Sequence, residues 1–188
     1  MSAPRRNLEL KAVDPDPQAT LDAALALGAH DEGVLHQRDT YFHAVQGRLK
    51  LREAQVGGTE FAELIAYARA DRTEPRVSSY RVVAVADHIA LADALADALG
   101  VRAVVEKQRR VLLYQSVRIH LDRIAGLGDF VELEALVTGP GGPAAEQPKL
   151  AELQRALGVT DDRLVARSYA DLLERRGMAV PRRCGKRG

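Results

Sequence analysis

Two distant segments of this chain carry polar side chains at every second position, a spacing that could gather charge around a ligand. The polar members are Asn7, Glu9 and Lys11 in the first segment, and Glu132 and Glu134 in the second. Side chains on a strand alternate between two faces, so each set would share one face of a sheet. Carboxylates gathered there need a compensating cation, and Mg²⁺ or Mn²⁺ prefer oxygen ligands. The alternative is a sheet whose charged face is simply hydrated.

The same alternation recurs along the chain and predicts the elements that would position these residues. Helices are expected from Asp14 to Gly28 and from Asp87 to Gly100, because Asp caps a helix and Gly ends one. Two more helical patterns follow a Gly- and Pro-rich linker at residues 139–143. The expected strands cover residues 5–13, 34–45, 47–54, 59–70, 77–85, 101–115, 116–124 and a last segment after the turn at 125–128; the later helices cover about 144–157 and 161–175.

The architecture that follows is α+β, with eight mostly antiparallel strands. Closing such a sheet into a barrel removes its exposed edges. Helices packed outside would cover the apolar face, so the polar faces would line a tunnel. Residues 1–175 are expected to form this single domain, and residues 176–188 a basic, disordered tail.

Composition excludes several other classes. The chain has 188 residues and a net charge of +1, so no global attraction to nucleic acid or to a membrane is expected. Its one cysteine, Cys184, excludes an internal disulfide, and the sequence shows neither a membrane span nor the apolar core of a signal peptide. We expect a cytoplasmic protein and leave a homodimer open.

Cations outnumber carboxylates on the expected inner face, which indicates a ligand with several phosphates. Arg guanidinium groups match phosphate oxygens bidentately and Lys supplies point charges, so triphosphate is the natural ligand class. The candidate carboxylates are Glu9, Asp122, Glu132 and Glu134; the candidate phosphate-binding cations are Lys11, Arg48, Lys50, Arg52, Arg69, Arg81, Lys107, Arg109 and Arg118.

Several motifs in this order resemble the CYTH superfamily, which groups class IV adenylyl cyclases, thiamine triphosphatases and triphosphate tunnel metalloenzymes. The resemblance covers about residues 5–173. Its motifs are Asn7-x-Glu9-x-Lys11, the segment at 37–42, Lys50-x-Arg52, the segment at 126–134 and the terminal Ser168-Tyr169-Ala170-Asp171 stretch.

The resemblance implies a tunnel that binds a triphosphate together with Mg²⁺ or Mn²⁺. It places metal-binding carboxylates at Glu9, Glu132 and Glu134, and Asp122 joins them from the polar face of its strand. It also matches Arg81 to a basic position on the fifth strand. His120, beside Asp122, is a candidate base, with a structural hydrogen-bonding role as the alternative. The catalytic set is Lys11, Arg52, Lys107, Arg109 and His120.

One departure from the family pattern bears on function. The signature begins Glu-x-Glu, and Asn7 stands at its first position; Tyr67 stands where many members carry a lysine. The resemblance favours a class IV cyclase that converts ATP to cyclic AMP and pyrophosphate. An organic or inorganic triphosphatase, a non-catalytic phosphate or nucleotide binder and an enzyme acting on a diphosphate ester remain open. The corresponding ligands are ATP, thiamine triphosphate, triphosphate or a diphosphate ester.

Overall fold

A computed structural model describes residues 4–178 of the chain. Its strands are β1 (Arg5–Val13), β2 (His30–Phe42), β3 (Arg48–Val56), β4 (Thr59–Arg69), β5 (Arg76–Val85), β6 (Val101–Tyr114), β7 (Val117–Ile124) and β8 (Gly128–Leu136). Its helices are α1 (Pro17–Ala26), α2 (His88–Leu99), α3 (Gly142–Ala156) and α4 (Tyr169–Arg175), with a 3-10 turn at Asp161–Arg163.

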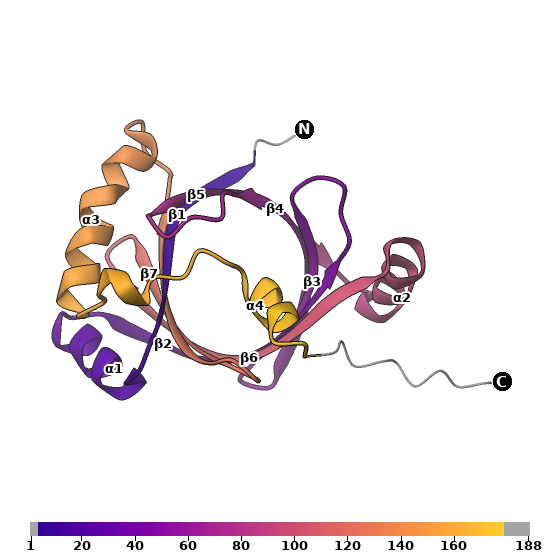
Figure 1. The fold of residues 1–188 in the computed structure, drawn as a ribbon, viewed down its shortest axis with the longest axis horizontal. Helices are drawn as coiled ribbons and strands as arrows, with labels where there is room; N and C mark the ends of the chain where they lie inside the picture. Colours follow the sequence, from indigo (N-terminus) through magenta and orange to yellow (C-terminus); the bar gives the residue numbers. More distant parts are fainter. Residues whose placement is uncertain (1–3, 179–188) are drawn as a thin grey trace.

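The strands close into one barrel in the order β1-β5-β4-β3-β2-β6-β7-β8, and each neighbouring pair is antiparallel. Figure 1 shows the ring of strands nearly end on, with α1 and α3 on one side and α2 on the other. The predicted α+β fold with a closed eight-stranded barrel is confirmed.

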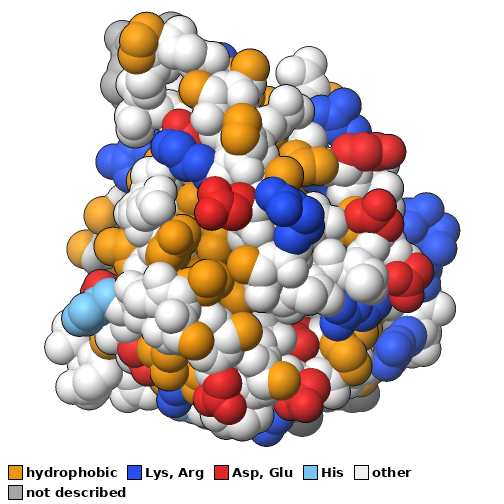
Figure 2. Space-filling view, turned by 90° about the vertical axis from the view of Figure 1, so that its left-hand side faces the viewer, with side chains coloured by type: hydrophobic (Ala, Val, Ile, Leu, Met, Phe, Trp, Pro, Cys, Tyr) orange, Lys and Arg blue, Asp and Glu red, His pale blue; other side chains and the backbone are white. Residues whose placement is uncertain are grey.

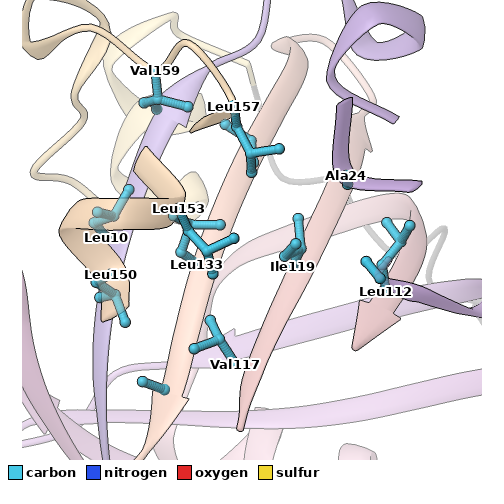
Figure 3. Close-up of a cluster of buried hydrophobic side chains, with 14 of the residues drawn as sticks. Leu10, Ala24, Leu112, Val117, Ile119, Leu133, Leu150, Leu153, Leu157 and Val159 are labelled. Carbon is cyan, nitrogen blue, oxygen red and sulfur yellow. The ribbon is translucent and has the colours of Figure 1, made fainter. Parts of the chain in front are cut away.

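The barrel is inside out, because its apolar core lies between the strands and the helices. Leu10, Ile119 and Leu133 point outward and are fully buried against α3 residues such as Leu150 and Leu153 (Figure 3). The alternate positions on the same strands are polar and face the lumen. Burial of the outer face therefore fixes the register, since a one-residue slip would exchange the two faces.

Capping residues set the helix boundaries as the sequence indicated. The Asp16 side chain accepts a hydrogen bond from the Ala19 N–H at the start of α1. Asp87 does the same for the Ala90 N–H at the start of α2, and Gly100 ends that helix with a φ of +75°. No residue of α2 is buried, so this helix contacts the outside of the barrel without contributing to its core.

The predicted helix over residues 161–175 is wrong in its first half. The helix begins only at Tyr169, where Ser168 and Asp171 form a reciprocal capping box. Before it, the chain is extended enough for Leu164 to bridge to Ala12 of β1. The helix also lies within the ring of strands in Figure 1 rather than outside it. A smaller shift affects β2, which covers His30–Phe42 instead of 34–45.

Helix α4 closes one end of the tunnel. Tyr169, Ala170 and Leu173 pack against inward-facing residues at that end, among them Tyr41 and Phe130. The ring of Tyr169 meets Phe130 edge to face, with the centroids 5.1 Å apart. We refer to this closed end as the floor, and to the opposite end as the mouth.

Beyond α4, Arg176 donates a hydrogen bond to the Gly126 carbonyl at 2.7 Å. Most of the predicted basic tail, residues 179–188, lies outside the described residues. Among the helices described, none is both long and apolar enough to cross a membrane. On the face viewed in Figure 2, acidic and basic side chains are interspersed rather than gathered by sign.

Candidate functional site

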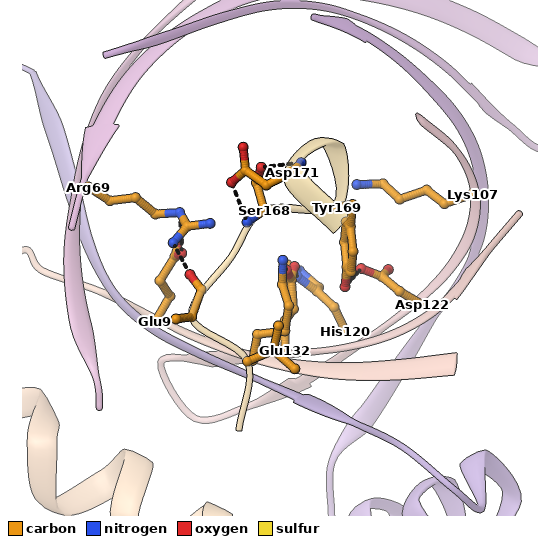
Figure 4. A network of polar contacts seen from close by, with 12 residues as sticks. Glu9, Arg69, Lys107, His120, Asp122, Glu132, Ser168, Tyr169 and Asp171 are labelled. Atoms are coloured by element: carbon orange, nitrogen blue, oxygen red, sulfur yellow. Dashed lines mark hydrogen bonds and ion pairs between the residues drawn. The ribbon is translucent and has the colours of Figure 1, made fainter. Parts of the chain in front are cut away.

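The lumen of the barrel forms a cavity of about 930 Å³ lined by all eight strands. This volume lies in the range of small-molecule sites, roughly 300–1,000 Å³. Figure 4 shows charged side chains converging on it from opposite walls, with Tyr169 of α4 among them. The alternation that buries leucines outside therefore directs ionisable groups inward.

Asp39 of β2 holds three cations from neighbouring strands. Its carboxylate accepts hydrogen bonds from Lys50 at 2.8 Å, from Arg52 at 2.7 and 2.8 Å, and from Lys107 at 3.4 Å. Asp39 itself is 1% exposed, whereas the three cations line the cavity. One negative charge cannot neutralise three positive ones, so this wall presents excess positive charge to the lumen.

The Asp39 cluster shifts the protonation of its members. Burial opposes ionisation of Asp39, but Arg52, Lys107 and Lys50 outweigh it and hold the pKa of Asp39 well below its usual range. Burial, with Arg109 nearby, lowers the pKa of Lys107 to about 7. Burial and Arg52 likewise lower the pKa of Lys50 to about 8. Both lysines can therefore change charge near neutral pH.

A second cluster surrounds Glu132 of β8. Its carboxylate pairs with Lys11 at 3.0 Å and with Arg109 at 2.6 Å. Arg109 in turn donates to both oxygens of Asp122 at 2.6 and 2.5 Å, and the Tyr169 hydroxyl donates to Asp122 at 2.9 Å. Helix α4 is thus tied to this cluster by a buried hydrogen bond, so the floor and the Glu132 cluster form one network.

His120 lies between the two glutamates of β8. Its ring nitrogens are 3.8 Å from Glu132 and 3.8 Å from Glu134. Burial and the charge of Arg109 lower the pKa of His120. The imidazole is therefore neutral at pH 7 and can accept a hydrogen bond.

Asn7 bonds directly to Glu134. Its side-chain Nδ2 donates to Glu134 Oε1 at 2.5 Å, while its Oδ1 is buried without a hydrogen-bond partner in the described part of the chain. A carboxylate at position 7 would repel Glu134, whereas the amide satisfies it. Asn7 therefore supplies a donor where the family pattern places a second negative charge.

Glu9 points toward the floor and pairs with Arg69 at 3.4 Å and with Arg76 at 3.3 Å. Burial and the nearby charge of Glu132 raise the pKa of Glu9. Arg69 and Arg76 also donate to the carbonyls of Ala166 and Val165. These arginines therefore connect Glu9 to the segment that precedes α4. Figure 4 shows Arg69 paired with Glu9.

Most residues expected on the inner face line the cavity, and three do not. Arg81 is exposed on the outer face of β5, whose inward residues are Ser78, Tyr80 and Val82, so its expected inward placement was wrong. Arg48 is held at the floor by Asp71 and Asp171 and does not line the cavity. The carboxylate of Asp122 lies behind Arg109, which occupies both oxygens. The inward residues from the sequence prediction that line the cavity are Asn7, Glu9, Lys11, Lys50, Arg52, Arg69, Lys107, Arg109, Arg118, His120, Glu132 and Glu134.

Sequence reasoning did not assign roles to Asp39, Arg76 or Tyr169. Asp39 is two residues from both Gln37 and Tyr41, so the alternation along the strand places it on the same inward face. The segment at 37–42 that contains Asp39 was already one of the motifs of the family resemblance. Arg76 precedes Ser78 and Tyr80 by the same period of two. Nothing in the sequence places Tyr169 in the lumen, because its position depends on where α4 docks.

The oxygen atoms that Glu132, Glu134 and Asn7 present to the cavity suit a hard divalent cation. Glu132 and Glu134 supply carboxylate oxygens, and the unpartnered Asn7 Oδ1 supplies a carbonyl oxygen. Within residues 4–178, however, no three His, Cys, Asp or Glu side chains gather closely enough to hold a metal by themselves. A cation here would thus depend on the Asn7 carbonyl or on oxygens of the ligand.

Comparison with known proteins identifies the fold. A model of the CYTH domain matches residues 5–169. The PH1012 protein of Pyrococcus horikoshii superposes with a TM-score of 0.75 at 21% identity, covering 88% of this chain and 98% of that one. No curated protein matches the sequence significantly.

Two further solved structures share the architecture. A candidate adenylate cyclase of Vibrio parahaemolyticus gives a TM-score of 0.72 at 18% identity, with 89% of this chain and 97% of that one covered. HpAC1 of Hippeastrum, a protein described with a dominant triphosphatase activity, gives 0.58 at 15% identity and covers 94% and 98%.

Proposed function

Because this chain belongs to the CYTH family, we propose that it binds the phosphate chain of a small-molecule substrate in its tunnel and cleaves a phosphorus–oxygen bond there. CYTH tunnel enzymes typically process triphosphates and generally use divalent metal ions. In this chain, the residues that line the tunnel would bind the phosphates and the metal ion.

The observation that carries the proposal is the sharing of Asp39 by Lys50, Arg52 and Lys107. Buried charge is costly unless it is compensated, and a single carboxylate pairs with all three cations. A phosphate chain would supply further negative charge. It would lie against these cations with Lys11 and Arg109 beside it, and Arg guanidinium groups would bind its oxygens as a fork.

These residues would also stabilise the charge that develops as the bond breaks. Cations that are already positioned in a desolvated cavity interact strongly with a leaving phosphate. Neutral His120 would accept a proton from the attacking hydroxyl or water. The carboxylates of Glu132 and Glu134 would stabilise the imidazolium that results. Asp39 and Asp122 would keep their cations oriented without touching the ligand.

Glu132, Glu134 and Asn7 would hold a Mg²⁺ or Mn²⁺ ion. Such an ion, when bound, neutralises phosphate oxygens and acts as a Lewis acid. The Asn7 amide already satisfies Glu134 by hydrogen bonding, so we propose that this chain binds the ion more weakly than a chain with a carboxylate at position 7.

The reaction has two candidate forms. In a hydrolase, water attacks the terminal phosphorus, the diphosphate portion leaves and orthophosphate is formed; in a cyclase, the ribose 3′-hydroxyl of ATP attacks the α-phosphorus and pyrophosphate leaves. The triphosphatase activity described for HpAC1 supports the hydrolase, and we propose hydrolysis as the main reaction. The description of the Vibrio protein as a candidate adenylate cyclase keeps cyclisation as the second form.

Incubation with inorganic triphosphate, thiamine triphosphate or ATP, each with Mg²⁺ or Mn²⁺, tests the proposal. We expect orthophosphate release that Arg52→Gln reduces at least tenfold. Cyclic AMP with pyrophosphate would select the cyclase instead. Binding without turnover of any of the three would contradict an enzymatic role.

A further inference from the structure

The tunnel has two walls of different chemistry. Strands β1, β7 and β8 contribute the acidic wall with Asn7 and His120. The opposite wall, from β5 and β4 across to β2 and β6, carries apolar side chains in its half nearer the mouth. We call these residues the apolar belt: Leu35, Phe61, Ile65, Val82 and Val111.

The belt lies between the floor and the mouth, beginning at the level of the cations and extending beyond them. On β4, Arg69 bonds to the segment before α4, and Ile65 and Phe61 follow on the same face toward the mouth. On β2, Tyr41 packs at the floor and Leu35 lies beyond Asp39 and Gln37. A ligand with its phosphates on the cations would therefore extend its organic part along the belt.

The belt adjoins the cations directly. Ile65 pairs across the strands with Lys50 on one side and with Val82 on the other, and Leu35 pairs with Arg109. Phe61 remains 42% exposed although its neighbours on the belt face the same cavity. This juxtaposition of charge and apolar surface suits a ligand with a charged head and an apolar body.

A nucleoside fits this wall poorly. Its sugar and base carry several hydrogen-bonding groups, which lose free energy when they are buried without partners. The belt side chains offer no hydrogen-bonding groups; the polar groups on these strands come from neighbouring inward residues, among them Gln37, Glu63 and Tyr80. Glu63 lies between Phe61 and Ile65 on β4 and pairs across the strands with Arg52, so it lies at the level of the cations rather than at the mouth.

We propose that the organic part of the substrate is apolar, so that the natural ligand is a diphosphate or triphosphate ester of an apolar alcohol. This inference rests on the proposed function, because it assumes that the phosphates bind the cation wall. It adds the chemical class of the group that those phosphates carry.

Calorimetric titration of the full chain with a series of ethyl, butyl, hexyl and octyl diphosphates tests the inference, with inorganic diphosphate, inorganic triphosphate and ATP as references. Burial of each methylene should tighten binding about fourfold until the chain reaches the mouth. ATP should bind no tighter than inorganic triphosphate. A flat alkyl series, or ATP binding tighter than hexyl diphosphate, would overturn the inference.

The references separate the two proposals. If inorganic di- and triphosphate bind and the alkyl series is flat, the substrate class is wrong and the phosphate site stands. If neither inorganic ligand nor any ester binds, the proposed function itself fails.

A matched pair of variants on β5 localises the effect. Val82→Thr replaces one methyl group on the belt with a hydroxyl of similar size, whereas Val83→Thr makes the same change at a residue that is 58% exposed on the outer face. We expect Val82→Thr to weaken octyl diphosphate at least threefold without affecting inorganic diphosphate. Val83→Thr should leave both unchanged, and equal effects of the two variants would contradict the assignment of the belt.

Discussion

The carboxylate of Asp39 and the ammonium group of Lys107 lie 3.4 Å apart inside the barrel, although 68 residues separate them in the chain. Lys50 and Arg52 share the same carboxylate. The cation wall is thus organised around one anion that does not itself line the cavity. This arrangement positions the cations before any ligand binds.

Asp39→Asn should strongly destabilise the protein. The change keeps the shape but leaves three buried or half-buried cations without their anion, and breaking a buried pair costs about 3–5 kcal/mol. Thermal unfolding should show a melting temperature lower by roughly 10 °C. Inorganic diphosphate should raise the melting temperature of the variant more than that of the parent, because it replaces the lost charge.

Glu53→Gln is the matched control. Glu53 pairs with Arg38 and His88 on the partly exposed outer face of the neighbouring strand. Surface pairs contribute about 0–1 kcal/mol, so this variant should unfold within a few degrees of the parent. Similar losses in the two variants would show that Asp39 does not organise the wall.

Asn7→Glu should make the protein depend on a divalent cation. The new carboxylate would face Glu134 without the hydrogen bond that Asn7 now donates, and two carboxylates side by side need a cation. We expect a lower melting temperature without metal and a larger stabilisation by Mn²⁺ than in the parent. Asn7→Ala, which removes the donor without adding charge, should show no such gain from Mn²⁺. Triphosphate turnover with Mn²⁺ should rise in Asn7→Glu, and an unchanged rate would indicate that the missing ligand does not limit the reaction.

Phosphate affinity should fall as the pH rises from 6.5 to 9. The pKa of Lys107 is lowered to about 7 and that of Lys50 to about 8. Each is protonated below its pKa and neutral above it, so the wall loses positive charge through this window. Calorimetry in buffers of different ionisation enthalpy should show proton uptake on binding near pH 8. In Lys107→Arg, whose guanidinium stays charged, the uptake should diminish; an undiminished uptake would assign the proton to another group.

Tyr169→Phe should loosen the link between α4 and the cluster of Asp122, Arg109 and Glu132. The variant leaves Asp122 without the hydroxyl that donates to it at 2.9 Å, and an unmade buried hydrogen bond costs about 1–3 kcal/mol. Urea unfolding should report this loss together with weaker triphosphate binding through Arg109. Tyr114→Phe is the control, since within residues 4–178 no hydrogen bond of the Tyr114 hydroxyl is found. Equal stability of the two variants would remove Tyr169 from the network.

Two arginines, one on β3 and one on β5, should behave oppositely. Arg52 lines the cavity, and hydrogen bonds to charged groups contribute about 1.5–3 kcal/mol, so Arg52→Gln should weaken inorganic triphosphate binding at least tenfold. Arg81 is exposed on the outer face of β5, so Arg81→Gln should bind as the parent does. A comparable loss in Arg81→Gln would indicate that Arg81 contributes to ligand binding.

The alternation of polar and apolar residues predicts an eight-stranded barrel and the polarity of most of its strands. The period of two in segments such as Leu8-Glu9-Leu10-Lys11 separates an apolar face from a charged one, and burial of the apolar face fixes which side each residue takes. The expected placement failed at Arg81 because residues on both faces of β5 are polar. On β5 the alternation therefore does not show which face points inward, and pairing with β1 and β4 determines that face.

Which charges meet depends instead on the order of the strands and on where α4 docks. Asp39 reaches Lys107, and Tyr169 reaches Asp122, through strand order and through the docking of α4 inside the ring. Contacts between residues so distant in the chain depend on which strands pair and in what register, which no local pattern encodes. The apolar belt has the same origin, since its members come from four strands and become neighbours only when the sheet forms.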